Sequence, residues 1–180
     1  MKTRKLIAAS LFVALTGLFI SCDDDDTVSC TPDYTGALSD EETTFVGSWE
    51  LTGITSDEEI DLTDDEEDNP STDIYAQQTE CQNDIVYTFN SDRTYTYEQG
   101  GVVEDCEATE DFSGSWKLGG TTLGLVTNCY ESIQTLEFNA EETEYTVQTS
   151  GIATDASGQQ IQIVVTYTYS QKLAEIEPAN

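Results

Sequence analysis

Apolar and polar residues alternate with a period of two along most of the chain from Thr44 onward. The alternation is clearest between Gln160 and Tyr169, where one face collects Ile161, Ile163, Val165, Tyr167 and Tyr169. A period of two is typical of strands that bury one face. We therefore predict strands in the segments 45–51, 85–89, 95–97, 112–118, 122–127, 133–139, 144–149 and 160–169.

Short polar turns, such as residues 119–120 and 140–142, separate many of these segments. Strands joined by short turns pair as antiparallel hairpins, and about eight of them can close into an up-and-down barrel. The expected fold is therefore all-β, with a β-sandwich as the alternative. We place this domain at residues 44–172, after a flexible, acidic tether at residues 22–43 and before a tail at residues 173–180.

The register of one hairpin follows from its aromatic residues. Tyr87 and Phe89 share a sheet face with Tyr95 and Tyr97 only if the numbers of paired residues sum to an even value, about 184. A three-residue loop that ends at Arg93 satisfies this register, with Arg93 in the left-handed conformation.

The N-terminus has the three parts of an export signal: basic Lys2, Arg4 and Lys5, an apolar run from Leu6 to Ile20, and small Ser21. The apolar run has 15 residues. A helix of that length reaches about 22 Å, which is less than the hydrocarbon core of about 30 Å. We therefore predict a removable signal peptide at residues 1–21.

The residues Phe19-Ile20-Ser21-Cys22 resemble the lipobox of bacterial lipoproteins. The resemblance implies that Cys22 carries acyl chains such as palmitate and anchors the protein to a membrane. An ordinary secretory signal, with Cys22 as an incidental thiol, is the alternative.

Asp23 to Asp26 follow Cys22 directly and resemble the acidic export signal of Bacteroidetes-type lipoproteins, which implies an outer-membrane anchor on the cell surface. A periplasm-facing anchor with a plain solvated spacer remains the alternative.

The chain carries 36 acidic and 6 basic residues, for a net charge of −30. Such a surface repels nucleic acid, so we expect no nucleic-acid partner.

Histidine is absent, which removes serine-type triads and most zinc sites. We expect no catalytic residue, cofactor or metal and a monomeric, non-enzymatic protein; a hydrolase built from two carboxylates is the minor alternative.

Beyond Cys22 the chain holds four cysteines: Cys30, Cys81, Cys106 and Cys129. An even number in an exported chain indicates two disulfides, for which three connectivities exist. The hairpin register described above places Cys81 and Cys106 together at the open end of one hairpin. We therefore predict a Cys81–Cys106 disulfide and, by elimination, a Cys30–Cys129 disulfide.

Acidic residues dominate the segment 57–73. We interpret it as a long mobile loop, and ordering around calcium is the alternative, because hard cations prefer clustered carboxylates.

Two similar motifs, residues 45–51 with Gly47 and Trp49 and residues 112–118 with Gly114 and Trp116, look like the Gly-x-Trp first strand of lipocalins. Together with the cysteines and the lipobox, they resemble bacterial envelope lipoproteins that carry a lipocalin-like domain. The resemblance implies a barrel with a possible cavity for a small apolar ligand, although a fold alone does not prove binding.

Only one core is available to the apolar faces of these strands. We therefore expect the following side chains to converge inside the barrel: Trp49, Phe89, Tyr95, Trp116, Phe138 and Val165. Trp49, Trp116 and Val165 are assigned to packing, and Phe89, Tyr95 and Phe138 are the candidate ligand contacts. The leading hypothesis is a lipid-anchored protein that binds a small hydrophobic or amphiphilic ligand. The alternative is a filled barrel that serves as a structural or interaction module of the cell surface.

Overall fold

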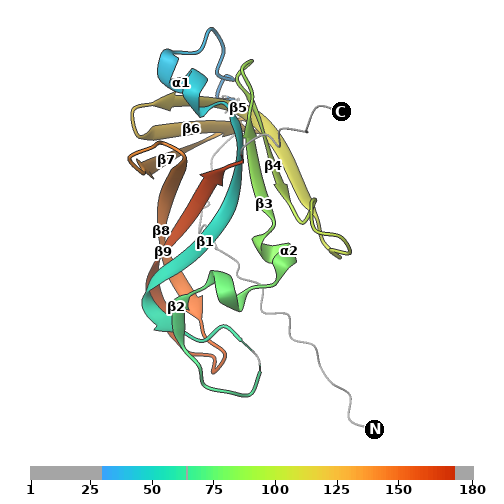
Figure 1. The fold of residues 1–180 in the computed structure, drawn as a ribbon, viewed down its shortest axis with the longest axis vertical. Coiled ribbons are helices and arrows are strands. Elements are labelled where there is room, and N and C mark those ends of the chain that lie inside the picture. Colours follow the sequence, from blue (N-terminus) through green and yellow to red (C-terminus); the bar gives the residue numbers. More distant parts are fainter. Residues whose placement is uncertain (1–29, 64, 173–180) are drawn as a thin grey trace, which may run out of the picture.

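The computed structural model describes residues 30–63 and 65–172. Within these ranges, nine strands form one antiparallel sheet, and β9 pairs back onto β1 to close eight of them into a barrel (Figure 1). The ninth, β2, lies outside the ring on β1. The prediction of an all-β, up-and-down barrel is confirmed. The strands are β1 (Gly47–Ile60), β2 (Ser71–Asp73), β3 (Ile85–Phe89), β4 (Thr94–Gln99), β5 (Glu110–Gly119), β6 (Thr122–Thr127), β7 (Tyr130–Phe138), β8 (Glu144–Thr154) and β9 (Gln160–Gln171).

In the described residues three short helices accompany the strands: α1 (Asp40–Phe45), η1 (Tyr75–Gln77) and α2 (Glu80–Asn83). The expected signal peptide, Cys22, the acidic run after it and the C-terminal tail lie outside the described residues.

The β3–β4 hairpin has the register expected from the sequence. Phe89 pairs with Tyr95 and Ile85 pairs with Gln99. Arg93 closes the loop with a φ of 70°. Its conformation therefore confirms the left-handed position predicted for it.

Aromatic and aliphatic side chains fill the end of the barrel under α1. The core draws residues from all eight barrel strands. Trp116 is fully buried and Trp49 is 1% exposed, and their indole N–H groups donate to the carbonyls of Asn90 and Phe45, each at 3.0 Å. All six side chains predicted to converge inside the barrel lie in this cluster or against it.

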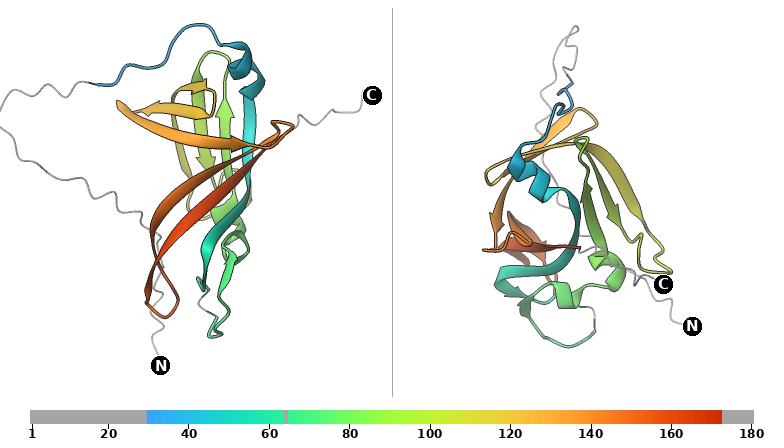
Figure 2. Two further views of the ribbon diagram at one scale, coloured as in Figure 1. Left: turned by 90° about the vertical axis from the view of Figure 1, so that its left-hand side faces the viewer. Right: turned by 45° about the horizontal axis from the view of Figure 1, so that its top comes forward.

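Residues 30–45 are part of the folded domain, whereas the sequence led us to expect a tether through residue 43. They run over the outside of the barrel and end in α1, which covers one end of it (Figure 2). Ser39 caps α1: its hydroxyl accepts from the amide of Glu42, and the Glu42 carboxylate accepts from the amide of Ser39. One apolar residue of α1, Phe45, is 3% exposed and anchors the helix in the core.

We call residues 30–39 the N-terminal strap. The amide of Tyr34 donates to the hydroxyl of Ser115 at 2.8 Å, and the Tyr34 ring occupies the place that a Cβ atom at Gly124 would need. The strap therefore covers the outer face of β5 and β6, and this contact explains why Ser115 and Gly124 are buried although they point away from the core.

Both disulfides have the connectivity predicted from the sequence. Cys81 in α2 is bonded to Cys106 in the β4–β5 connection, and Cys30 is bonded to Cys129 in the β6–β7 turn. The second bond ties the start of the N-terminal strap to the barrel.

The acidic segment is more ordered at its ends than we expected. β1 continues through Ile60, and β2 pairs with it. Ile60 and Ile74 are 1% and 3% exposed and extend the core towards η1. Ile60 inside the segment and Ile74 just after it thus hold the segment against the barrel.

Candidate ligand-binding site

The wall of the barrel is incomplete between β7 and β8. These strands share only three residue pairs, from Leu136–Val147 to Phe138–Tyr145. Beyond them, β7 pairs with β6 alone and β8 pairs with β9 alone. Figure 2 shows β7 and the β8–β9 hairpin running apart. The ring is therefore complete at the α1 end, which we call the closed end, and open on one side beyond it, in what we call the open half.

Solvent reaches the inner face of the open half. Thr149 and Gly151 pair with Val165 and Ile163, whose side chains belong to the interior or pack against it. Cross-strand partners share a face, yet Thr149 and Gly151 are exposed. A Cβ atom built at Gly151 meets no atom within 4 Å. There is thus room for an additional group on this inner face.

A continuous row of aromatic rings leads from the rim of the open half into the core. Its ring centroids are 4.5, 5.0, 5.6 and 5.1 Å apart in the order Phe112, Tyr97, Tyr87, Tyr169 and Tyr145. Phe112 at the rim is 38% exposed, and Tyr145 at the inner end is 2% exposed. We call these five residues the aromatic row.

Three hydroxyls of the row lack a partner within the described residues: those of Tyr87, Tyr145 and Tyr169. The one fully buried side-chain polar atom without a hydrogen bond in this part of the chain is Oδ1 of Asn83. The three hydroxyls are therefore not sealed in protein, and each adjoins space that a water molecule can reach. The hydroxyl of Tyr97, by contrast, donates to Oε1 of Gln99 at 3.0 Å.

The tyrosines of the row stay protonated at neutral pH. Burial raises the pKa of Tyr97 to about 12, and the nearby Glu110 carboxylate and Tyr167 add to this effect. Burial also raises the pKa values of Tyr87 and Tyr169. Each neutral phenol offers one donor and a pair of acceptor sites. The row thus presents uncharged hydrogen-bonding groups between apolar ring faces.

Within the described chain, no basic residue lies in the aromatic row. Arg93 is held by Glu42 at the closed end, Lys117 is exposed and pairs with Gly124 on the outer face, and Lys172 forms an ion pair with Glu50. The acidic residue on the inner face of the rim is Glu110, which pairs with Gln99. The electrostatic potential at the open half is therefore negative.

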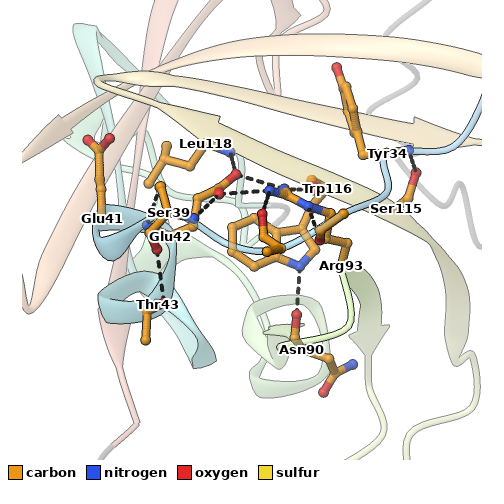
Figure 3. Close-up of polar contacts among 12 residues, drawn as sticks. Tyr34, Ser39, Glu41, Glu42, Thr43, Asn90, Arg93, Ser115, Trp116 and Leu118 are labelled. Atoms are coloured by element: carbon orange, nitrogen blue, oxygen red, sulfur yellow. Dashed lines mark hydrogen bonds and ion pairs between the residues drawn. The ribbon is translucent and has the colours of Figure 1, made fainter.

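A buried ion pair holds the closed end together (Figure 3). Two guanidinium nitrogens of Arg93 donate to the two carboxylate oxygens of Glu42 at 2.7 and 2.8 Å. Arg93 also donates to the carbonyls of Gly36 and Ala37, and the amide of Leu118 donates to Glu42. These contacts join the strap, α1, the β3–β4 loop and β5. They also lower the pKa of Glu42 to about 2.

The residues chosen from the sequence as ligand contacts lie at or near the closed end. Phe89 and Tyr95 are each 1% exposed in the packed core, where a ligand cannot reach them without repacking. Phe138 lines a small hollow beside α1, which is open to solvent. The period-two pattern already put Tyr97 and Tyr167 on the inner face, but it could not show which end of the barrel is open.

Over 30–63 and 65–172, no group of three or more Cys, Asp or Glu side chains is placed to hold a metal ion. No helix in these ranges is both long and apolar enough to cross a membrane.

A search among curated proteins found no match. A family model described as "Domain of unknown function (DUF5004)" matches residues 23–172, which include every strand of the barrel, and the chain therefore belongs to the DUF5004 family.

Proposed function

We propose that this protein is a non-enzymatic, lipid-anchored envelope protein whose barrel binds a small hydrophobic or amphiphilic molecule in the open half. The observation that carries the proposal is the aromatic row beside an exposed inner face, in which three of the four tyrosine hydroxyls lack a partner within the described residues. Ligand sites combine apolar walls with a few polar groups that orient the ligand. The open half has this composition, whereas the closed end is packed.

A substitution that fills the open half tests the proposal. Gly151→Trp adds a large ring where a Cβ atom meets open space. The neighbouring Ile152→Trp is the matched control, because Ile152 is 67% exposed and points to the outer face. We expect native mass spectrometry of protein purified from its host to show a retained small molecule in the wild type and in Ile152→Trp, and none in Gly151→Trp. Equal retention in both variants would contradict the site.

Anchoring through Cys22 is the second part of the proposal, and the lipobox-like sequence before Cys22 supports it. Metabolic labelling with a fatty-acid analogue should mark the wild type but not Cys22→Ser. Deletion of Asp23 to Asp26 tests surface location separately. We expect the deletion to reduce cleavage of the protein by protease added to intact cells while lipid labelling persists.

An interaction module remains the second candidate, because large apolar side chains are exposed near the opening. Tyr130 and Ile133 on β7 are 78% and 59% exposed. If the open half is the working site, Ile133→Asp should leave small-molecule retention unchanged. If β7 contacts a protein partner, Ile133→Asp should abolish cross-linking on the cell surface and Gly151→Trp should not.

A further inference from the structure

We infer that the open half takes an apolar molecule that bears an uncharged hydrogen-bonding group, such as a hydroxyl or carbonyl, and that this group points inward to the hydroxyls of Tyr87 and Tyr169. The inference rests on the proposed ligand-binding function and narrows it to one chemical class and one orientation.

The inner end of the aromatic row supplies the polar contacts. Tyr87 on β3 and Tyr169 on β9 are joined by a ring contact of 5.6 Å. Tyr169 is 8% exposed and Tyr87 is half-buried, so a ligand at their hydroxyls displaces the water that solvates them. A phenol that loses this water and gains no other hydrogen bond is costly. A ligand hydroxyl or carbonyl that bonds to these phenols satisfies them, and an alkane cannot.

The rim of the same row offers apolar surface beside the charged Glu110. Phe112 is 38% exposed there, and the half-buried side chains of Val165 and Ile161 pack against the core from β9. The unpartnered phenol groups lie deeper than this apolar surface. They therefore orient an amphiphile with its polar group inward and its apolar part at the rim.

Charge excludes the ionised amphiphiles. A carboxylate or phosphate beside Tyr169 would be buried without a counter-ion, because the described basic residues all lie elsewhere, and a buried, unpaired charge is strongly unfavourable. A buried cation is also disfavoured, since the Glu110 carboxylate lies at the exposed rim rather than beside Tyr169. The net charge of −30 adds long-range repulsion of anions.

Probes that share one alkyl chain but differ in their polar group test the chemical class of the ligand. The full mature chain is loaded with the fluorescent, uncharged N-phenyl-1-naphthylamine, which is then displaced by decanol, decanoate or decyltrimethylammonium below their micellar concentrations. We expect decanol to displace the dye at a concentration at least tenfold lower than either ion. Gly151→Trp should reduce dye binding at least tenfold, as the proposed function requires.

Removal of single hydroxyls tests the orientation. Tyr169→Phe and Tyr87→Phe keep the rings and should weaken decanol binding about fivefold or more while displacement by naphthalene, which has no polar group, stays the same. Tyr34→Phe is the control, because its hydroxyl bonds to Glu131 on the outer face. Circular dichroism melts confirm that each variant is folded before it is titrated.

The possible results separate the two claims. If neither the dye nor decanol binds saturably to the wild type, the ligand-binding function itself fails. If decanol binds and Gly151→Trp blocks it, but decanoate binds equally well or both Phe variants behave like the wild type, only the class and orientation inferred here are overturned.

Discussion

The closed end and the open half of the barrel are lined by the same kinds of residue but differ in packing. Trp49 and Trp116 at the closed end are almost fully buried, whereas Tyr97 and Tyr167 in the open half are half-buried. The closed end is covered by α1, and there β7 reaches β8. Aromatic composition therefore does not distinguish a packed core from a ligand site in this barrel; the presence of a covering helix and a complete wall does.

Replacing one large aromatic residue by alanine at each end should give the largest difference in the free energy of unfolding. We expect Trp116→Ala to lower the free energy of unfolding by about 3 to 5 kcal/mol, because it leaves a cavity in a packed core. Tyr167→Ala should cost about 1 to 2 kcal/mol, because part of its surface is already hydrated. Urea denaturation measures both, and equal losses would mean that the open half is as tightly packed as the closed end.

The ion pair at the closed end should make stability depend on pH. The pKa of Glu42 falls from an ordinary value of 4.5 to about 2 in the folded protein, chiefly through the Arg93 hydrogen bonds. A lowered folded pKa means that the contribution is complete above about pH 5 and is lost as the pH falls towards 2. The shift corresponds to about 3 kcal/mol. In urea denaturation at several pH values, Glu42→Gln should lack this part of the acid response; an unchanged pH profile would contradict the role of Glu42.

Adding one methyl group at either of two inner-face glycines tests the same difference in packing with the smallest expected effect on stability. A Cβ atom at Gly114 would collide with the carbonyl of Val126 and lie 2.8 Å from the Tyr95 ring, whereas one at Gly151 meets no atom within 4 Å. We expect Gly114→Ala to destabilise by about 1 to 3 kcal/mol and Gly151→Ala to be neutral or to stabilise by up to about 1 kcal/mol. The melting temperatures of the two variants should shift in different directions or by clearly different amounts.

Local patterns in the sequence predicted the features that depend on neighbouring residues. The alternation of apolar residues placed the strands, and the spacing of Phe89 and Tyr95 predicted both the hairpin register and the left-handed Arg93. The same register brought Cys81 close to Cys106. Each of these inferences involves residues joined by one short loop, for which the sequence pattern constrains the geometry.

Features that depend on distant pairing were not predictable in this way. The six-residue α1 is too short and polar to show a helical period, although Ser39 and Glu42 have the spacing of a capping box. The partner of Glu42 is Arg93, on a loop far along the chain. The early separation of β7 and β8 likewise depends on the whole barrel, so the sequence could not show that Tyr97 and Phe112 lie near an opening and Phe89 does not.

The Cys30–Cys129 bond determines where a mechanical pull enters the domain. Tension applied through the chain before Cys30 passes through the disulfide to the β6–β7 turn and does not run along residues 31–46. The helix α1 and its ion pair are therefore outside the force path, and the closed end keeps its cover under load. After reduction of this bond, the same tension would act on the strap first, peel Tyr34 from Gly124 and then pull on α1. A domain held in this way would resist shear in its oxidised form and uncover its core under shear once it is reduced.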